Sequence, residues 1–176
     1  MRFADRTLLT IYLQYAGKDN PNLESSIDAR VLDLVSLIET AYLSTPTAFK
    51  PMDFAHLAQY FTMDVLTDVA FSKPLGYLKA NADLHGYIQT VRAYMPILEL
   101  QTNIPLINTL LGNAIVRKIM APTARDRFGM GKMMGVAKSV AGERFGKGKV
   151  VKEDMLGSFV KHGMNQAQTE SEALLQ

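Results

Sequence analysis

The amino-acid sequence predicts an all-α protein of six to seven helices, and three observations support this. Apolar residues recur at steps of three and four in several stretches, which places them on one side of a helix. Breakers that contain proline or glycine separate these stretches. No pair of alternating apolar and polar runs flanks a hairpin turn, as paired strands would require. A length of 176 residues favours a single domain, residues 1–176, with a sizeable core.

The first well-marked helix is predicted from about residue 21 to residue 42. Pro21 suits the first helical position and Asn20 can cap it. The apolar positions of this helix follow one face over about five turns. They are Leu23, Ile27, Val31, Leu34, Ile38 and Tyr42. The apolar run before it, Leu8–Ala16, is expected to be a buried helix, with a signal peptide as the less favoured alternative.

The stretch 53–78 carries the strongest helical signal in the chain. Asp53 can serve as N-cap, the helix must end before Pro74, and Gly76 permits the sharp turn that follows. The apolar positions of the helix are predicted to form its packing face. They are Phe54, Leu57, Ala58, Phe61, Val65 and Val69.

The second half of the chain is predicted to be helical in shorter pieces. A helix is expected from about Ala82 to Tyr94, where Met95-Pro96 breaks it. Residues 97–112 are apolar and interrupted by Pro105, so a short helix or a pair of loops is expected there.

The last elements follow the same logic. A helix is predicted from just after Ala121-Pro122 to about Phe145, and residues 146–149 form a flexible polar turn. Glu153 or Asp154 begins another helix that ends at Gly163, and residues 171–176 open a further one.

Composition excludes several classes of site. The chain has no cysteine, so it can form no disulfide, thiolate metal site or cysteine nucleophile. No apolar run reaches the length of a transmembrane helix. Residues 115–149 hold nine Lys/Arg against two acidic residues. Only Phe128 and Phe145 accompany these bases, so a solvated helix face is favoured over nucleic-acid binding.

The remaining motifs favour structural roles. His56, His85 and His162 lack the spacing of metal ligands. Asp64 and Asp68 lie one helical turn apart and could do acid–base or metal chemistry, but exposed or capped carboxylates are favoured. Four methionines fall in the basic stretch, and ordinary core filling is favoured there over an adaptable binding surface. They are Met120, Met130, Met133 and Met134.

Residues 53–78, DFAHLAQYFTMDVLTDVAFSKPLGYL, resemble the helix-E segment of cytochrome P-450 monooxygenases of the fungal kind. In that family Asp-Val-hydrophobic-x-Asp-hydrophobic-Ala-Phe leads into a Pro-hydrophobic-Gly turn. Other segments resemble the family in the same order along the chain. They are residues 17–39 for helix D, 82–112 for helix F and the following loop, 121–145 for helix G, 153–164 for helix H, and 171–176 for the start of helix I. The resemblance implies a partial cytochrome P-450 fold without the haem-binding core.

For intact family members the resemblance implies a haem-dependent, NADPH-driven monooxygenase that oxidises small lipophilic molecules of secondary metabolism. A flavin reductase would supply electrons at the endoplasmic reticulum membrane. The family's haem ligand is a cysteine thiolate, which this chain lacks. The expectation is therefore a truncated, cytoplasmic chain that is inactive alone, has no catalytic, cofactor-binding or metal-binding residue and binds no nucleic acid. The alternatives are a stand-alone helical protein that binds a ligand or partner, and one half of a split monooxygenase.

One region could keep a role that the resemblance implies. In this family the connection between helices F and G covers the substrate channel, and it maps here to residues 94–112. Its apolar residues fit a lid over a lipophilic substrate, and they fit a buried loop equally well. The candidate lid residues are Met95, Pro96, Ile97, Leu98, Leu100, Ile104, Pro105 and Leu106.

Overall fold

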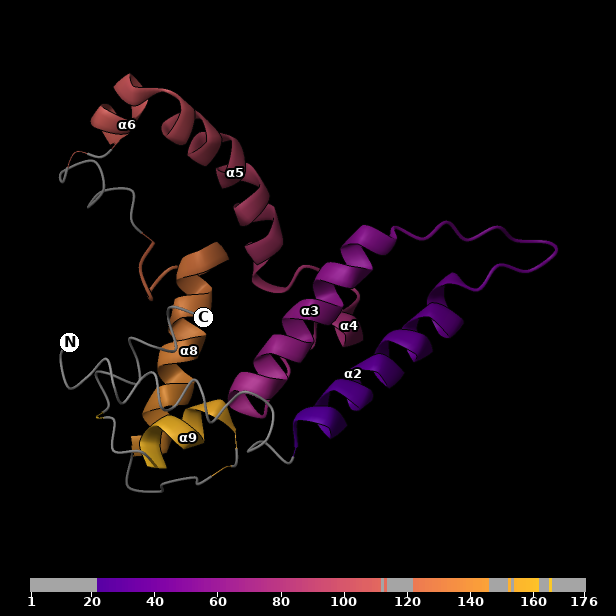
Figure 1. The fold of residues 1–176 in the computed structure, drawn as a ribbon. Coiled ribbons are helices and arrows are strands. Elements are labelled where there is room, and N and C mark those ends of the chain that lie inside the picture. The colour runs from indigo at the N-terminus through magenta and orange to yellow at the C-terminus, as the bar shows by residue number, and fades with distance from the viewer. Residues whose placement is uncertain are drawn as a thin grey trace. The chain divides into compact units, whose positions relative to one another are not determined.

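The computed structural model describes residues 22–111, 113, 122–145, 152, 154–161 and 165. Within these residues the chain forms seven α-helices and no strand, as the sequence predicts, apart from one isolated bridge between Thr45 and Ala48 (Figure 1). The expectations for residues 8–16, 146–149 and 171–176 lie outside the described residues. The elements are α2 (Leu23–Leu37), the π-helix η1 (Ile38–Tyr42), α3 (Phe54–Phe71), α4 (Tyr77–Ala80), the 3-10 turn η2 (Leu84–Gly86), α5 (Tyr87–Asn103), α6 (Pro105–Leu111), α8 (Gly129–Phe145) and α9 (Met155–Lys161).

The chain separates into two compact units. The first comprises Met1–Leu84 together with Ser139–Gln176, and the second comprises His85–Lys138. Helix α8 begins in the second unit and ends in the first. The expectation that residues 1–176 form a single domain stays a prediction.

In the first unit, α2 packs against α3 and α4, and α3 also contacts α9 (Figure 1). The predicted helix over residues 21–42 is confirmed as α2, which begins at Leu23 with Asn22 as N-cap and continues into the π-helix η1. The predicted cap Asn20 and first helical residue Pro21 lie outside the described residues. The predicted apolar face of this helix is half-buried, except that Val31 is exposed. After Tyr42 the chain leaves the helix through a turn in which Thr45 and Ala48 exchange backbone hydrogen bonds of 2.9 and 3.2 Å.

Helix α3 begins and ends where the sequence predicts. The Asp53 side chain accepts a hydrogen bond from the backbone N–H of His56, at 3.1 Å, so it is the N-cap. The helix ends at Ser72, whose φ of 50° is left-handed, two residues before Pro74. The face that is most deeply buried differs from the predicted one. Of the predicted face only Leu57 is fully buried, and Phe54 is 57% exposed.

The second unit corrects the predicted helix over residues 82–94 at both ends. Helix α5 cannot begin before Tyr87 because His85 and Gly86 have left-handed φ values of 68° and 62°. It also does not break at Met95-Pro96 but continues to Asn103. Proline removes one backbone donor, and here the loss falls in the exposed stretch 92–100, where water can hydrate the backbone.

Helix α8 begins at Gly129, seven residues later than Pro122, so the predicted start is also wrong. A local turn holds the intervening residues out of the helix. Thr123 donates to Asp126 from its backbone N–H, at 2.9 Å, and from its hydroxyl, at 2.7 Å. This turn crosses α8 closely, since a Cβ added at Gly131 would lie 2.3 Å from the Thr123 carbonyl oxygen.

Candidate functional site

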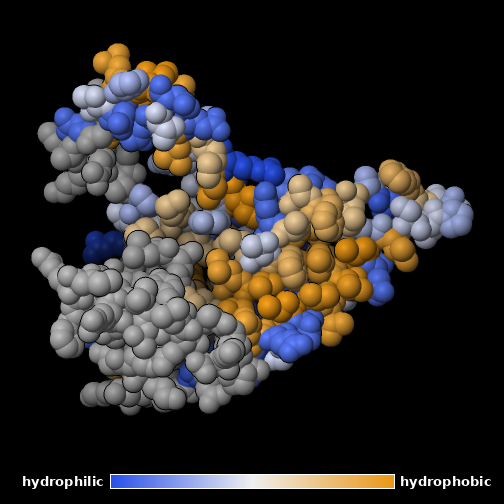
Figure 2. Space-filling view, viewed as in Figure 1, coloured by the Kyte–Doolittle hydropathy of each residue, from blue (hydrophilic) through white to orange (hydrophobic). Residues whose placement is uncertain are grey.

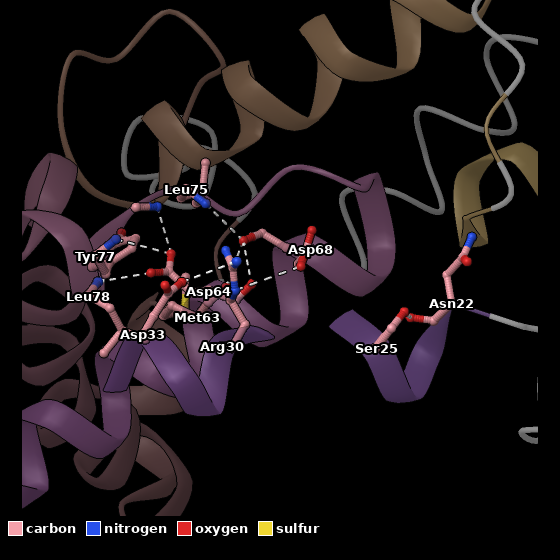
Figure 3. Close-up of polar contacts among 12 residues, drawn as sticks. Asn22, Ser25, Arg30, Asp33, Met63, Asp64, Asp68, Leu75, Tyr77 and Leu78 are labelled. Carbon is pink, nitrogen blue, oxygen red and sulfur yellow. Dashed lines mark hydrogen bonds and ion pairs between the residues drawn. The ribbon is translucent and has the colours of Figure 1, made fainter. Parts of the chain in front are cut away.

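A buried polar cluster surrounds Asp64, which is only 2% exposed (Figure 3). One carboxylate oxygen accepts hydrogen bonds from the backbone N–H groups of Gly76, at 2.7 Å, and Tyr77, at 3.0 Å. The other accepts from the N–H of Leu78, at 2.8 Å. The first turn of a helix leaves such donors without partners, so a carboxylate from α3 caps α4. Its role is therefore to fix the backbone. A structural role was favoured from the sequence, but the expected exposure of this carboxylate is wrong.

Two further side chains stabilise residues 72–86, which connect α3 to α5, through hydrogen bonds. The hydroxyl of Thr67 donates to the carbonyl of Met63, at 2.8 Å, and accepts from the N–H of Leu75, at 3.2 Å. The fully buried Tyr77 donates its hydroxyl to the carbonyl of Leu84, at 2.7 Å. The connection is thus held at its start, middle and end by hydrogen bonds to α3 or within itself.

Asp68, one turn after Asp64, belongs to a different and more open cluster (Figure 3). The Arg30 guanidinium on α2 lies 3.9 Å from Asp68 and 3.1 Å from Asp33. Burial raises the pKa of Asp68 above its ordinary value, and the positive charge of Arg30 partly offsets this. The cluster connects α2 to α3. The negative charge of the nearby Asp64 also raises the pKa of Asp68. Asp64 accepts three backbone N–H groups and Asp68 faces Arg30, so both carboxylates have structural partners.

A buried ion pair joins the ends of three helices in the first unit. Arg144 at the end of α8 pairs with Asp154, and both side chains are almost fully buried. Arg144 also donates to the carbonyl of Phe71, at 3.3 Å, at the end of α3. Asp154 caps α9 by accepting from the N–H of Gly157, at 2.7 Å. Lys152 donates to the Ser72 carbonyl, at 3.3 Å, which adds a second positive charge at the negative end of the α3 dipole.

The candidate lid residues all lie in the second unit, on α5, on α6 and at the residue between them. All eight are exposed, and Leu106 is 79% exposed. The first five fall on α5, which contradicts the expected break at Pro96 and makes this segment helical. Every residue of the stretch 95–100 except Glu99 is apolar, so the apolar side chains there are not confined to one side of the helix. Figure 2 shows hydrophobic and hydrophilic residues mixed over the part of the surface that α5 and α6 form.

A side-chain hydrogen bond connects α5 and α6. The Gln101 amide donates to the side-chain carbonyl of Asn108 across the bend at Ile104, at 3.4 Å. The segment 94–106 contains one charged residue, Glu99. We call the eight candidate lid residues the α5–α6 apolar surface.

Two exposed apolar residues flank the start of α8, namely Phe128 and Met130. Both were noted in the sequence, Phe128 as an aromatic among the basic residues and Met130 as one of the clustered methionines. A Cβ added at Gly129 would lie 2.5 Å from the Thr90 hydroxyl, so Gly129 closely approaches Thr90 of α5. Gly129 has a left-handed φ of 67°, which favours glycine at this position.

The described residues provide no cluster of three His, Cys, Asp or Glu side chains that could hold a metal ion. His56 instead contacts Asp53 through its Nδ1, at 2.6 Å, and His162 lies outside the described residues. The whole sequence lacks the cysteine that a haem thiolate requires, so the residues present do not fit that group. Among the described residues no helix is both long and apolar enough to cross a membrane.

Comparison with known proteins gives consistent relatives. The chain is 40% identical over 165 residues to cytochrome P-450 monooxygenase ABA1 of Pyricularia oryzae. It is 37% identical over 162 residues to cytochrome P-450 monooxygenase aba1 of Botryotinia fuckeliana, and 34% identical over 162 residues to cytochrome P-450 monooxygenase abl1 of Leptosphaeria maculans. No family model matches the chain, and no solved structure matches it.

These alignments cover 91–92% of this chain but only 28–32% of the relatives. The chain therefore spans about a third of the length of the curated relatives that it matches. The all-helical architecture and the ordered resemblance along the sequence agree with these matches. The chain is thus a homologue of fungal cytochrome P-450 monooxygenases that corresponds to part of their length.

Proposed function

We propose that the α5–α6 apolar surface covers a small lipophilic substrate in a cytochrome P-450-type monooxygenase. The observation that carries this proposal is the exposure of eight apolar residues on two consecutive helices and the residue between them, ranging from 37% at Ile97 to 79% at Leu106 among the six that are not proline. Exposed apolar surface of this extent marks a binding surface in soluble proteins. A lipophilic molecule would bury these side chains and gain about 25 cal/mol for each Å² of apolar area removed from water.

The proposal includes the inactivity of these 176 residues taken alone. Oxygen activation in this family uses a haem thiolate, and the chain has no cysteine to supply one. In a completed enzyme the thiolate, the haem and the electrons from an NADPH-dependent flavin reductase would come from outside these residues. Such an enzyme would act at the endoplasmic reticulum membrane, whereas the chain alone would remain in the cytoplasm.

The first test asks whether the chain binds haem as a thiolate complex. The purified 176-residue chain is titrated with haemin, reduced, and exposed to carbon monoxide. We expect no red-shifted Soret band of the kind that thiolate-ligated haem gives. The appearance of that band with the chain alone would contradict the proposed inactivity. The same band formed only with a co-expressed partner chain would instead establish a split monooxygenase.

The second test concerns the substrate surface and does not depend on haem. A lipophilic fluorescent dye is titrated into the wild type and into the variant Leu98→Ser with Leu100→Ser. We expect the affinity for the dye to fall severalfold in the variant. The matched control is Leu32→Ser, which alters an exposed leucine on α2 in the first unit. Equal loss of affinity in both variants would remove the support for a lid.

A further inference from the structure

The methionines of the second unit differ in their exposure to solvent. The chain has ten methionines and no cysteine, so thioethers are its only sulfur groups. Among the described residues three methionines are exposed: Met52 at 41%, Met95 at 49% and Met130 at 41%. Four others are half-buried, namely Met63, Met133, Met134 and Met155. The core filling expected for the methionines of α8 therefore does not hold for Met130.

Two of the three exposed methionines, Met95 and Met130, lie in the second unit. Met95 is part of the α5–α6 apolar surface. Met130 follows Gly129, whose close contact with Thr90 places the start of α8 against α5. Met52 is equally exposed but lies in the first unit, in the segment before α3. Met52 is therefore a control that has similar exposure to Met95 and Met130 but lies in the other unit.

We propose that Met95 and Met130 are a reversible oxidation site that switches part of the second unit's surface from apolar to polar. A peroxide supplies the oxidant. The thioether sulfur attacks one peroxide oxygen, an S–O bond forms, the O–O bond breaks, and water leaves. The sulfur loses two electrons, which the peroxide gains. Methionine sulfoxide is polar, and two thiol-dependent reductases, one for each sulfoxide epimer, return it to the thioether.

The consequence follows from where these side chains lie. Sulfoxidation of a half-exposed thioether places a strong dipole in a surface that otherwise binds through apolar contact. Binding of a lipophilic molecule at that surface should therefore weaken without any loss of helix. This inference rests on the proposed function, because the surface that oxidation would alter is the one proposed to bind a lipophilic molecule. Dye binding by the untreated chain tests the proposed function, and the change in dye binding after oxidation tests this inference.

The experiment treats the intact chain with hydrogen peroxide and follows each methionine by peptide mass spectrometry. Lipophilic dye binding and far-ultraviolet circular dichroism are recorded on the same samples. Met52, Met95 and Met130 should oxidise severalfold faster than Met63, because susceptibility follows exposure. Dye affinity should fall as Met95 and Met130 are oxidised, and treatment with both sulfoxide reductases should restore it.

Two variants separate position from exposure. The variant Met95→Leu with Met130→Leu should keep its dye affinity after peroxide treatment, whereas Met52→Leu should lose affinity as the wild type does. Oxidation of Met63 at the same rate as Met95 would overturn the proposal. Equal loss of dye affinity in the double variant and the wild type would also overturn it. A rise in dye binding together with loss of the helical signal would do so too, since peroxide would then unfold the chain.

Discussion

The first unit buries the carboxylates of Asp64 and Asp154, whereas the second unit exposes apolar side chains along α5 and α6. A buried charge is tolerated only when hydrogen bonds and opposite charge replace its hydration. Those partners have fixed directions, so the polar clusters of the first unit specify one backbone geometry. Exposed apolar side chains do not fix the direction of a partner, but they favour contact with any apolar molecule or segment that buries them.

This difference between the two units suggests that residues important for stability lie mainly in the first unit and residues important for binding lie mainly in the second. Helix α3 and its polar partners hold α4, α8 and α9 in place, and their side chains are occupied in doing so. The second unit exposes apolar side chains on two consecutive helices, while the first unit exposes other large apolar residues, among them Leu32, Phe49 and Phe54. Substitutions in the first unit should therefore change the free energy of unfolding, and substitutions on the α5–α6 apolar surface should change binding.

The largest effect is expected for Asp64→Ala. This change leaves three backbone N–H groups without their acceptor in a buried site, at about 1–3 kcal/mol each. Urea unfolding followed by circular dichroism measures the loss. The control is Asp33→Ala, an exposed carboxylate paired with Arg30, which should cost less than about 1 kcal/mol. Similar unfolding free energies for the two variants would break the comparison between buried and exposed charge.

A loss of about 3–5 kcal/mol is expected for Arg144→Met, because Asp154 would remain charged and buried without its partner. Replacing both residues, Arg144→Met with Asp154→Leu, should cost less than the sum of the two single changes. A double-mutant cycle in urea measures the coupling free energy. Strict additivity would show that the ion pair does not join the helix ends.

A smaller loss, about 0.5–1.5 kcal/mol, is expected for Tyr77→Phe, which removes the hydroxyl donor to Leu84. The matched change Tyr94→Phe alters an exposed tyrosine on α5, and it should stay within about 0.5 kcal/mol of the wild type. Thermal unfolding of the two variants sharpens the comparison between the units with the same chemical change. A larger loss of thermal stability in Tyr94→Phe than in Tyr77→Phe would contradict the proposed difference between the two units.

Little change in stability is expected when Leu98 and Leu106 are each replaced by serine. Both side chains are exposed, so each substitution should alter the free energy of unfolding by less than about 0.5 kcal/mol. Urea unfolding of the two variants checks this. A loss of several kcal/mol would mean that the α5–α6 apolar surface is a structural core and not a binding surface.

The smallest effect concerns pH and the N-cap of α3. The side-chain hydrogen bond from His56 lowers the pKa of Asp53 below its ordinary value. A folded-state pKa below the unfolded one gives stability that is present above the unfolded pKa and is lost as pH falls through the folded pKa. Asp53→Asn should therefore flatten the acid side of a plot of melting temperature against pH. An unchanged acid slope would show that the cap does not depend on the charge.

Helices α2, α3 and α9 of the first unit could be predicted because local sequence rules determine them, whereas the short helix α4 was not predicted. Asp53 capped α3 and the residues before Pro74 ended it, as helix chemistry requires. The packing face of α3 could not be predicted by counting apolar positions, because Asp64 and Thr67 are buried through hydrogen bonds to residues 75–78. Those bonds join residues that are eight to fourteen positions apart, and periodicity contains no information about them.

The second unit was harder to predict for a different reason. Pro96 marked a break by the usual rule, but α5 passes through it in an exposed stretch where the lost hydrogen bond costs less. The start of α8 was displaced by the turn that Thr123 and Asp126 form. The candidate lid residues were found from the family resemblance, whereas the close approach of Gly129 to Thr90 could not be predicted from helical periodicity.

Amide hydrogen exchange of the 176-residue chain, resolved by residue, tests the contrast between the two units most directly. Protection reports the free energy of local opening. The N–H groups of Gly76, Tyr77 and Leu78 should exchange among the slowest in the chain, because opening them exposes the buried Asp64 carboxylate. The amides of residues 97–103 on α5 should exchange much faster and slow down when a lipophilic dye is added. Equal protection in the two segments, with no response to the dye, would contradict the account.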